Sequence, residues 1–332
     1  MSTLLLSYRV ATASGAEIER RSRELGERVE IIALPQDRDG RLPADVCATI
    51  DAAFFSSDVN PEYSRQFFSA VRKAPTLQWL HVYNVGVDHP IYTEMLERGV
   101  RVTTSAGSTA VPIAHTAVCG LLMLARNVPS WLAAQRERKW TPMRGTDVPR
   151  DLTGQTAVIF GLGSIGREIA RLGKALGLTV VGVRRSPMTS QDPVDELHPP
   201  DRLAELLSRA DWLIVAAPLT PETRGLIGAE LLSKLPSHAR LINVARGEIV
   251  DESALVDALR NGRLAGAYLD VFEKEPLPED SPLWNMPNVL VTPHNSSVAS
   301  GNDRRVYELF LENLHRWQRG EALLNEVSLK TR

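Results

Sequence analysis

Cysteine is scarce in this 332-residue chain: it has only Cys47 and Cys119, and neither has the partner spacing of a metal or redox motif. Two cysteines are too few for a disulfide framework, so a reducing compartment, the cytoplasm, is the simplest expectation. The seven histidines form no His-Glu-x-x-His or other clustered ligand pattern. We therefore expect no metal site.

An excess of charge of one sign is also missing. Lys and Arg number 38 against 40 Asp and Glu, which gives a formal net charge of −2. This balance excludes a chain-wide polybasic surface for nucleic acid or anionic lipid, although it leaves room for a local basic pocket. We expect neither nucleic acid nor a membrane as a partner.

Long hydrophobic runs are absent as well. The longest uncharged apolar stretch, residues 117–125, lies between His115 and Arg126. It is far shorter than the roughly 20 residues that cross a bilayer. Residues 1–6 contain three leucines but no preceding basic region, so we expect no secretory signal there.

Short apolar runs alternate with amphipathic stretches along nearly the whole chain. This alternation is typical of parallel sheets with helices on both faces, and the length suggests two domains of the ordinary size of roughly 100–200 residues. In the first part we expect strands at residues 4–8, 29–34, 52–56, 77–83 and 100–104, with helices at 16–25 and 61–73. A long apolar helix at 113–125, whose lack of charge indicates burial against another element or subunit, precedes a polar stretch at 135–150.

The second part has the same alternation. We expect strands at residues 157–161, 179–183, 212–216, 240–244, 267–270 and 289–292, and helices at 165–176, 201–209 and 252–260. Asp251 is a suitable cap and Gly262 a suitable stop for the last of these helices. Six strands in this order make a complete dinucleotide-binding sheet. An amphipathic helix at 300–319 follows.

Gly161, Gly163 and Gly166 have the G-x-G-x-x-G spacing, directly after a predicted strand and before a predicted helix. The first glycine permits a tight turn, the second lets a pyrophosphate approach the backbone, and the third lets helix and strand pack closely. The helix N-terminus adds amide donors and a positive dipole. A glycine-rich turn that binds nothing is the alternative, but the strand–turn–helix context favours a dinucleotide site.

The end of the next predicted strand commonly carries an acidic residue in NAD-binding folds, whereas here it carries Arg184, Arg185 and Ser186. Two guanidinium groups and a hydroxyl suit the 2′-phosphate of NADPH, and we expect no carboxylate there to repel it. The segment therefore predicts NADPH as the preferred cofactor, with NADH weaker. A solvated basic turn is the alternative.

Arg246, Glu275 and His294 each follow a predicted strand of the second part. Doubly wound sheets bind ligands at the carboxyl edge, so these three side chains should converge near the nicotinamide. Histidine can protonate the alkoxide that hydride transfer leaves on a ketone, a carboxylate favours its protonated form, and arginine can anchor a carboxylate. Each residue alone is more often structural, but the set together with the glycine loop favours catalysis.

With these motifs the chain resembles the D-isomer-specific 2-hydroxyacid dehydrogenases, a family that includes glyoxylate/hydroxypyruvate reductases and D-3-phosphoglycerate dehydrogenase. The resemblance covers nearly the whole chain and rests on residues 161–166, 217–223, 243–252, 269–278 and 293–294. It implies an α/β fold of two doubly wound parallel-sheet domains and a homodimer. A Rossmann cofactor domain, residues 106–294, would be inserted into a flavodoxin-like substrate domain, residues 1–105 and 295–332, with closure over the substrate.

The resemblance also implies roles for individual residues. Arg246 would hold the 2-oxo acid, His294 would be the acid/base, and Glu275 would pair with His294. The backbone amides of Val85 and Gly86 would bind the substrate carboxylate. Further cofactor contacts are implied for Ser164, Ile165, Pro218, Thr223, Val244, Ala245 and Asp270, the last of which would reach the nicotinamide amide. The chain departs from the family at His115, where glutamate is usual.

The sequence thus predicts an NADPH-preferring oxidoreductase that reduces small 2-oxo acids to D-2-hydroxy acids. A cofactor-sensing binding protein of the corepressor type, without turnover, is the alternative, although nothing resembles an added partner-binding tail. A formate dehydrogenase fits less well because those relatives carry glutamine in place of Glu275, while the motifs leave phosphite oxidation open. Residues 54–57, Asn84 and Trp284 are candidates to line the substrate pocket.

Overall fold

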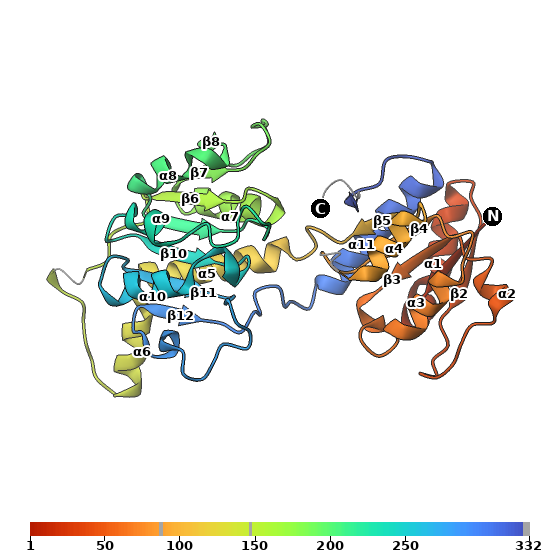
Figure 1. The fold of residues 1–332 in the computed structure, drawn as a ribbon, viewed down its shortest axis with the longest axis horizontal. Coiled ribbons are helices and arrows are strands. Elements are labelled where there is room, and N and C mark those ends of the chain that lie inside the picture. The colour runs from red at the N-terminus through yellow and green to blue at the C-terminus, as the bar shows by residue number, and fades with distance from the viewer. Residues whose placement is uncertain (86–88, 146–147, 328–332) are drawn as a thin grey trace. The chain divides into compact units, whose positions relative to one another are not determined.

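The chain divides into two units, and both ends of the chain belong to the same one (Figure 1). In this computed structural model, residues 1–85, 89–145 and 148–327 are described. The first unit comprises residues 1–108 and 299–332, and the second comprises residues 109–298.

A six-stranded sheet with the order β13-β5-β4-β3-β1-β2 forms the centre of the first unit. Its five parallel strands are β1 (Ser2–Leu6), β2 (Val29–Ala33), β3 (Ala52–Phe55), β4 (Trp79–Val82) and β5 (Arg101–Thr104). Their order is that of flavodoxin-like sheets. The edge strand β13 (Glu326–Val327) pairs antiparallel with β5 and was not expected, because two residues are too few to show a periodicity.

Helices cover both faces of this sheet: α1 (Tyr8–Glu24), α2 (Ala44–Cys47), α3 (Ser64–Arg72), α4 (Pro90–Glu97) and α11 (Asn302–Gln318). Apolar residues of α2, α3 and α4 share one buried cluster, and those of α1 and α11 share another. In the second cluster Phe310 of α11 stacks on Phe54 of β3, with ring centroids 4.3 Å apart. The C-terminal helix therefore completes the core of the N-terminal strands.

The extended conformation predicted through Tyr8 is wrong. The hydroxyl of Ser7 accepts a hydrogen bond from the backbone N–H of Val10 at 3.0 Å, and so caps a helix that begins at Tyr8. A serine cap of this kind satisfies one of the unpaired amides of the first turn.

The second unit contains a seven-stranded parallel sheet with the order β12-β11-β10-β9-β6-β7-β8. The strands are β6 (Thr156–Phe160), β7 (Thr179–Val183), β8 (Glu196–His198), β9 (Trp212–Val215), β10 (Arg240–Asn243), β11 (Gly266–Leu269) and β12 (Val289–Val291). The strand order reverses beside β6, which is the arrangement of dinucleotide-binding sheets. The seventh strand, β8, is three residues long and mostly polar, so the apolar pattern does not predict it. These two sheets confirm the predicted fold class.

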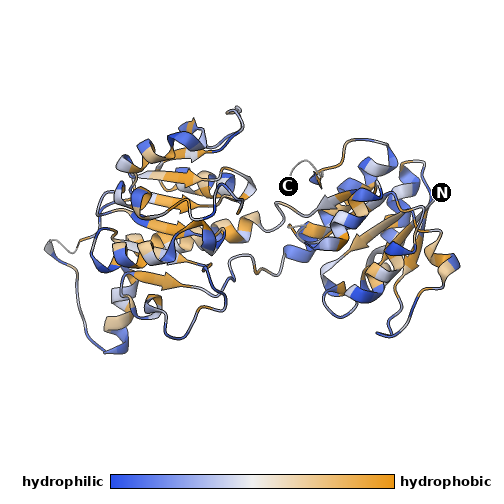
Figure 2. Ribbon diagram, in the orientation of Figure 1, coloured by the Kyte–Doolittle hydropathy of each residue, from blue (hydrophilic) through white to orange (hydrophobic). Residues whose placement is uncertain are grey.

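Helices also lie on both faces of the second sheet: α5 (Ala110–Ala125), α6 (Val128–Arg136), α7 (Ser164–Ala175), α8 (Leu203–Leu206), α9 (Ala229–Ser233) and α10 (Glu252–Arg260). The strands between them are the most hydrophobic part of the unit (Figure 2). The apolar helix α5 packs against β11 so closely that a Cβ atom at Gly120 would lie 2.4 Å from Cγ of Tyr268. Burial within its own unit explains the missing charges on this face of α5, whereas Val111 and Leu122 of the same helix remain exposed.

Two expectations about helix ends have different outcomes. Asp251 caps α10 as predicted, since its side chain accepts from the N–H of Ala254 at 3.0 Å, and Gly262 beyond it has a φ of +65°. The continuous helix predicted at residues 201–209 is wrong: α8 is a single turn with a 3-10 turn on each side, Pro200–Arg202 and Leu207–Arg209.

Among the described residues, no single helix is long and apolar enough to span a membrane. Only α5 and α6 taken together reach that length and composition, and they are bent by 71° at their junction.

Candidate active site

The loop between β6 and α7 contains three glycines, and a Cβ atom added at each of them would meet different surroundings. Gly161 has a φ of +100°, and a Cβ atom there would lie 2.3 Å from the backbone N of Ala217. A Cβ atom at Gly166 would lie 2.1 Å from the carbonyl oxygen of Gly161, so both positions need glycine. At Gly163 a Cβ atom would meet nothing within 4 Å.

Gly163 is also the N-cap residue of α7, and no side chain caps the helix there. The amides of the first turn, at Ser164, Ile165 and Gly166, are therefore directed to an open position in front of the helix. A helix N-terminus favours anions through its amides and its dipole. This loop fits the pyrophosphate of a dinucleotide.

Alanine substitutions should separate the two kinds of glycine. Gly166→Ala should destabilise the fold by about 1–3 kcal/mol, because the new methyl group overlaps a carbonyl oxygen. Gly163→Ala should leave the melting temperature unchanged but weaken NADPH binding about tenfold, because the methyl group enters the space of the pyrophosphate. Thermal unfolding and fluorescence titration measure the two effects, and normal NADPH affinity in Gly163→Ala would show that the cofactor takes another path.

The segment after β7 differs from the expectation. The guanidinium of Arg184 forks onto Asp192, with Nη1–Oδ1 and Nη2–Oδ2 distances of 2.8 and 2.7 Å. Asp192 is buried and also accepts from Arg167 and from the N–H and hydroxyl of Thr189. The expectation that no carboxylate lies here is wrong, because the chain folds back and brings Asp192 to an arginine eight residues earlier.

Asp192 keeps its charge in this setting. Burial raises its pKa, but the hydrogen bonds from Arg184 and Thr189 outweigh that effect and bring the pKa to about 2. Arg184 is thereby held within the loop, and its side chain is only 14% exposed. Arg185 is 76% exposed, and its nearest ion-pair contact is Glu222 at 3.7 Å. Of the two arginines, Arg185 has the guanidinium that is free to meet a ligand.

Glu275 and His294 lie side by side at the carboxyl edge of the second sheet. Nδ1 of His294 is 2.7 Å from Oε2 of Glu275, and the other carboxylate oxygen accepts from the N–H of Phe272 at 3.1 Å. Both side chains remain partly exposed, at 43% and 37%. The pair is therefore fixed in direction but open to a ligand.

Asp270 organises the backbone around His294. Its buried carboxylate accepts from the hydroxyl of Thr292 at 2.6 Å and from the N–H groups of Asn295 and Ser296 at 3.0 Å each. Its carbonyl oxygen accepts from the N–H of His294, which has a φ of +53°. A non-glycine residue rarely adopts this left-handed conformation unless its surroundings hold it there. Sequence reasoning missed this positioning role of Asp270.

Arg246 follows β10, two strands away from β12 in the sheet. The buried Asn243 holds its loop: the side-chain amide donates to the carbonyl of Arg246 at 3.1 Å and accepts from the N–H of Ala245 at 3.1 Å. A Cβ atom at Gly247 would lie 1.8 Å from the carbonyl carbon of Phe272. The loop that carries Arg246 is thus packed directly on the loop that leads to Glu275.

The other cofactor residues expected from the sequence also follow strands of the second sheet. Val244 and Ala245 are buried after β10. After β9, the hydroxyl of Thr223 donates to the carbonyl of Pro218 and accepts from the N–H of Thr220, both at 2.8 Å. Ser186 follows β7, and its carbonyl accepts from Nε of Arg184 at 3.1 Å. The sequence-derived residues of this unit therefore share one sheet edge.

The first unit holds the loop assigned to the substrate carboxylate. Val85 is exposed, and Gly86 lies outside the described residues. Phe55 and Asn84 line a cavity of about 400 Å³ at the carboxyl ends of β3 and β4. Trp284 belongs to the second unit, where its indole N–H donates to the carbonyl of Pro278 at 2.8 Å.

Three histidines outside the pair have structural surroundings. His81 is buried beside Thr103, at 2.7 Å, and burial lowers its pKa to about 3. His89 caps α4. His115 is exposed on α5 and faces Glu168 of α7, whose pKa is lowered mainly by its hydrogen bond with Arg171. The part of the chain that the structure describes has no group of three or more His, Cys, Asp or Glu residues able to hold a metal ion.

Comparisons with known proteins agree with this arrangement. Residues 118–296 match the family model described as "D-isomer specific 2-hydroxyacid dehydrogenase, NAD binding domain". A glyoxylate reductase of Korarchaeum cryptofilum is 36% identical over 269 residues, which cover 78% of this chain and 79% of the reductase. A D-3-phosphoglycerate dehydrogenase of Methanocaldococcus jannaschii is 31% identical over 261 residues, 78% of this chain, and the match spans about half, 49%, of that longer protein.

Solved structures of 2-hydroxyacid dehydrogenases match nearly the full length of this chain. A D-isomer specific 2-hydroxyacid dehydrogenase of Xanthobacter autotrophicus, in complex with NADPH and MES, is 33% identical with a TM-score of 0.75 and covers 99% of this chain and 98% of its own. An NADPH-dependent glyoxylate/hydroxypyruvate reductase of Sinorhizobium meliloti, with NADP and sulfate, is 27% identical with a TM-score of 0.68 and covers 98% of both chains. With the glycine loop and the histidine–glutamate pair at one sheet edge, these matches show that the chain belongs to the D-isomer specific 2-hydroxyacid dehydrogenase family.

Proposed function

We propose that the protein is an NADPH-preferring oxidoreductase that reduces small 2-oxo acids to D-2-hydroxy acids. The observation that carries this proposal is the contact of 2.7 Å between His294 and Glu275, at the same sheet edge as the glycine loop. A partly exposed imidazole that is held by a carboxylate, at the same sheet edge as a dinucleotide loop, is equipped to exchange a proton with a ligand that is being reduced.

The pair assigns a role to each ring nitrogen of His294. A carboxylate at Nδ1 keeps a hydrogen on that nitrogen and orients the ring, so Nε2 is the atom that exchanges a proton with the substrate oxygen. Bound NADPH supplies the hydride. Arg246 anchors the substrate carboxylate through its guanidinium.

Substrate assays test the proposal directly. The purified protein is mixed with NADPH and a panel of glyoxylate, hydroxypyruvate, and branched or aromatic 2-oxo acids, and loss of NADPH absorbance is followed. We expect turnover with at least one acid, and chiral chromatography of the product should give the D-isomer. NADPH binding without turnover on any acid would instead favour the corepressor-like sensor.

The NADPH preference is supported by Arg185, whose exposed guanidinium matches a 2′-phosphate, and by the relatives crystallised with NADPH or NADP. Arg185→Asp should lower kcat/KM with NADPH by about ten- to fiftyfold while leaving kcat/KM with NADH nearly unchanged, because only NADPH has the second phosphate. Arg202→Asp, at another exposed arginine of the same unit, is the control. A native enzyme that prefers NADH would contradict this assignment.

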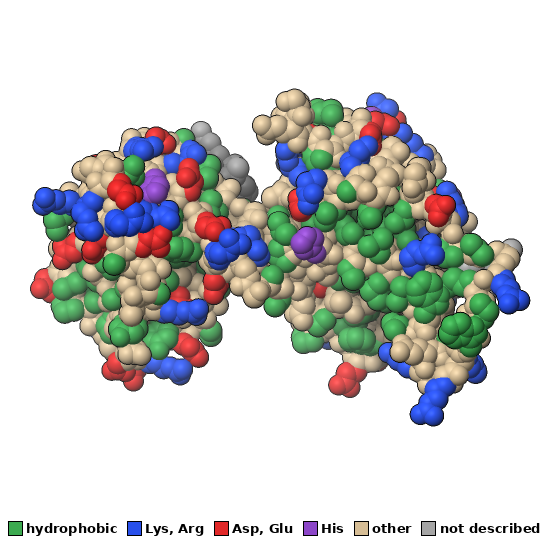
Figure 3. Space-filling model, turned by 180° about the vertical axis from the view of Figure 1, so that it is seen from behind, with side chains coloured by type: hydrophobic (Ala, Val, Ile, Leu, Met, Phe, Trp, Pro, Cys, Tyr) green, Lys and Arg blue, Asp and Glu red, His purple; other side chains and the backbone are tan. Residues whose placement is uncertain are grey.

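We further propose that the second unit is the cofactor domain and the first the substrate domain, and that two copies associate through the second unit. Hydrophobic side chains gather on the surface of this unit (Figure 3), and its exposed ones include Trp131, Leu132 and Trp140. Exposed large apolar groups of this kind commonly mark contacts between proteins. Light scattering on the eluting protein should give the mass of a dimer, and a monomer would count against the association.

A further inference from the structure

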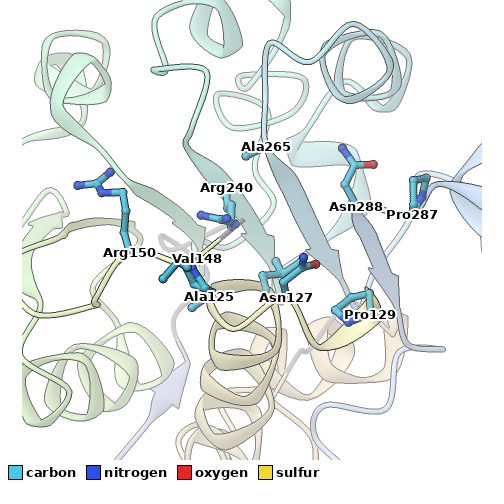
Figure 4. Close-up of a pocket in the computed structure, with 11 residues that line it drawn as sticks. Ala125, Asn127, Pro129, Val148, Arg150, Arg240, Ala265, Pro287 and Asn288 are labelled. Carbon is cyan, nitrogen blue, oxygen red and sulfur yellow. The ribbon is translucent and has the colours of Figure 1, made fainter. Parts of the chain in front are cut away.

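A cavity of about 440 Å³ lies in the second unit, at the edge of the sheet opposite to the glycine loop and His294. The starts of three strands face it, at Arg240 of β10, Ala265 before β11 and Asn288 before β12. The end of α5 and residues 148–150 close its other sides. Figure 4 shows Arg150, Arg240 and the two amides, Asn127 and Asn288, around it. Its volume is within the range of small-molecule pockets, roughly 300–1,000 Å³.

Arg240 is the unusual residue of this cavity. Its side chain is half-buried, with the guanidinium carbon 5.3 Å from the centre of the Trp212 ring. Its hydrogen bond to the carbonyl of His238 is long, at 3.5 Å. Among residues 1–85, 89–145 and 148–327, no carboxylate oxygen lies within ion-pair distance of this guanidinium. A half-buried charge without a close counter-ion is costly.

The carboxylate of Asp211, near Arg240, already accepts hydrogen bonds from other groups. Oδ1 of Asp211 accepts from Arg150 at 2.8 Å, and Oδ2 accepts from the N–H of Thr156 at 2.8 Å. Burial lowers the pKa of Arg240, and the nearby charge of Arg150 lowers it further, while Asp211 offsets only part of this effect. The described lining of the cavity therefore has two guanidinium groups, those of Arg150 and Arg240, and no carboxylate, so positive charge is in excess there.

We propose that this cavity binds a small organic anion, with a carboxylate or phosphate group paired to Arg240 and an apolar body against Leu124, Pro129 and Ala265. A guanidinium that stacks on an indole keeps its planar edge free for the two oxygens of such a group. Side-chain amides of Asn127 and Asn288 are within the same lining and can bind a further polar group. The site lies at the amino ends of the strands, so its ligand does not compete with a substrate at the carboxyl ends.

Calorimetry with benzoate tests the proposal, using a protein that carries Arg246→Gln so that the substrate anchor does not contribute. We expect one benzoate per chain, and no binding of the neutral analogue benzamide. Adding Arg240→Met, which keeps an unbranched apolar stem over Trp212, should weaken benzoate about ten- to hundredfold. Arg240→Lys should restore part of the affinity, and Arg202→Met, at an exposed arginine remote in the sequence, should have no effect.

The same calorimetry with phenyl phosphate in place of benzoate compares a phosphate with a carboxylate head group. The ligand that binds more tightly identifies the head group that the site prefers. Thermal unfolding of each variant verifies that the protein is folded. Failure of both anions to bind, or equal binding by the Arg240→Met protein, would overturn the proposal. The proposal is also overturned if neither anion binds and Arg240→Met weakens association between copies of the chain. A second copy would then occupy the cavity.

Discussion

Replacing His294 with asparagine should lower kcat for 2-oxo acid reduction by about two to four orders of magnitude, the usual contribution of a positioned general acid. Asparagine can still accept or donate hydrogen bonds beside Glu275, but it cannot deliver a proton at neutral pH. NADPH affinity should stay the same, because the glycine loop and the segment after β7 are separate from this side chain. Stopped-flow reduction and fluorescence titration measure the two quantities.

A matched control exists in the same sheet. Nε2 of His198 is 2.8 Å from Oε2 of Glu196, so this pair has nearly the N–O distance of the His294 pair, but through the other ring nitrogen. It lies on the edge strand β8, away from Glu275. His198→Asn should therefore retain full turnover. If His294→Asn retained turnover as well, His294 would not be the acid.

Replacing Arg246 with glutamine should raise KM for the oxo acid and lower kcat/KM by about a hundredfold or more, since a forked bond to a charged group contributes ~3 kcal/mol. The side chain is exposed, and its guanidinium donates to the carbonyl of Ala245 at 2.7 Å. The Asn243 bonds hold the backbone of the loop independently of this side chain, so the substitution leaves the loop intact. Arg246→Lys should recover only part of the loss, because an ammonium cannot form the fork.

The same steady-state measurements distinguish anchoring from chemistry. A loss confined to KM identifies a residue that binds substrate and transition state equally, whereas an equal loss in kcat identifies one that acts in the transition state alone. Arg224→Gln, at an exposed arginine 3.7 Å from Glu248, is the control and should keep both constants. Unchanged kcat and KM in Arg246→Gln would remove this residue from the substrate site.

The sequence predicts the fold well because apolar periodicity and strand-end motifs are local signals. The strands after which Gly161, Arg246 and His294 stand are found within a residue or two of their expected ends. Parallel strands share a carboxyl edge, so these residues were expected to gather, and the structure places His294 beside Glu275.

Several features of the site were not predicted because they depend on contacts between separate segments of the chain. No short sequence pattern reveals such contacts. Asp192 reaches Arg184 because the intervening chain turns back, and the role of Asp270 depends on amides 25 and 26 residues later. Likewise, the need for glycine at position 247 comes from the backbone of Phe272 on a different loop. Such long-range packing is decided by tertiary structure and has no local periodicity.

The stacking of Phe310 on Phe54 has a consequence for synthesis of the chain. Leu4, Phe54 and Trp79 share a core cluster with α11, which leaves the ribosome more than two hundred residues later. The second unit is contiguous, so it can fold while the first still exposes an uncovered apolar sheet face. Chains released before Asn302–Gln318 is made would keep that face exposed, so truncated products should be the species that chaperones retain.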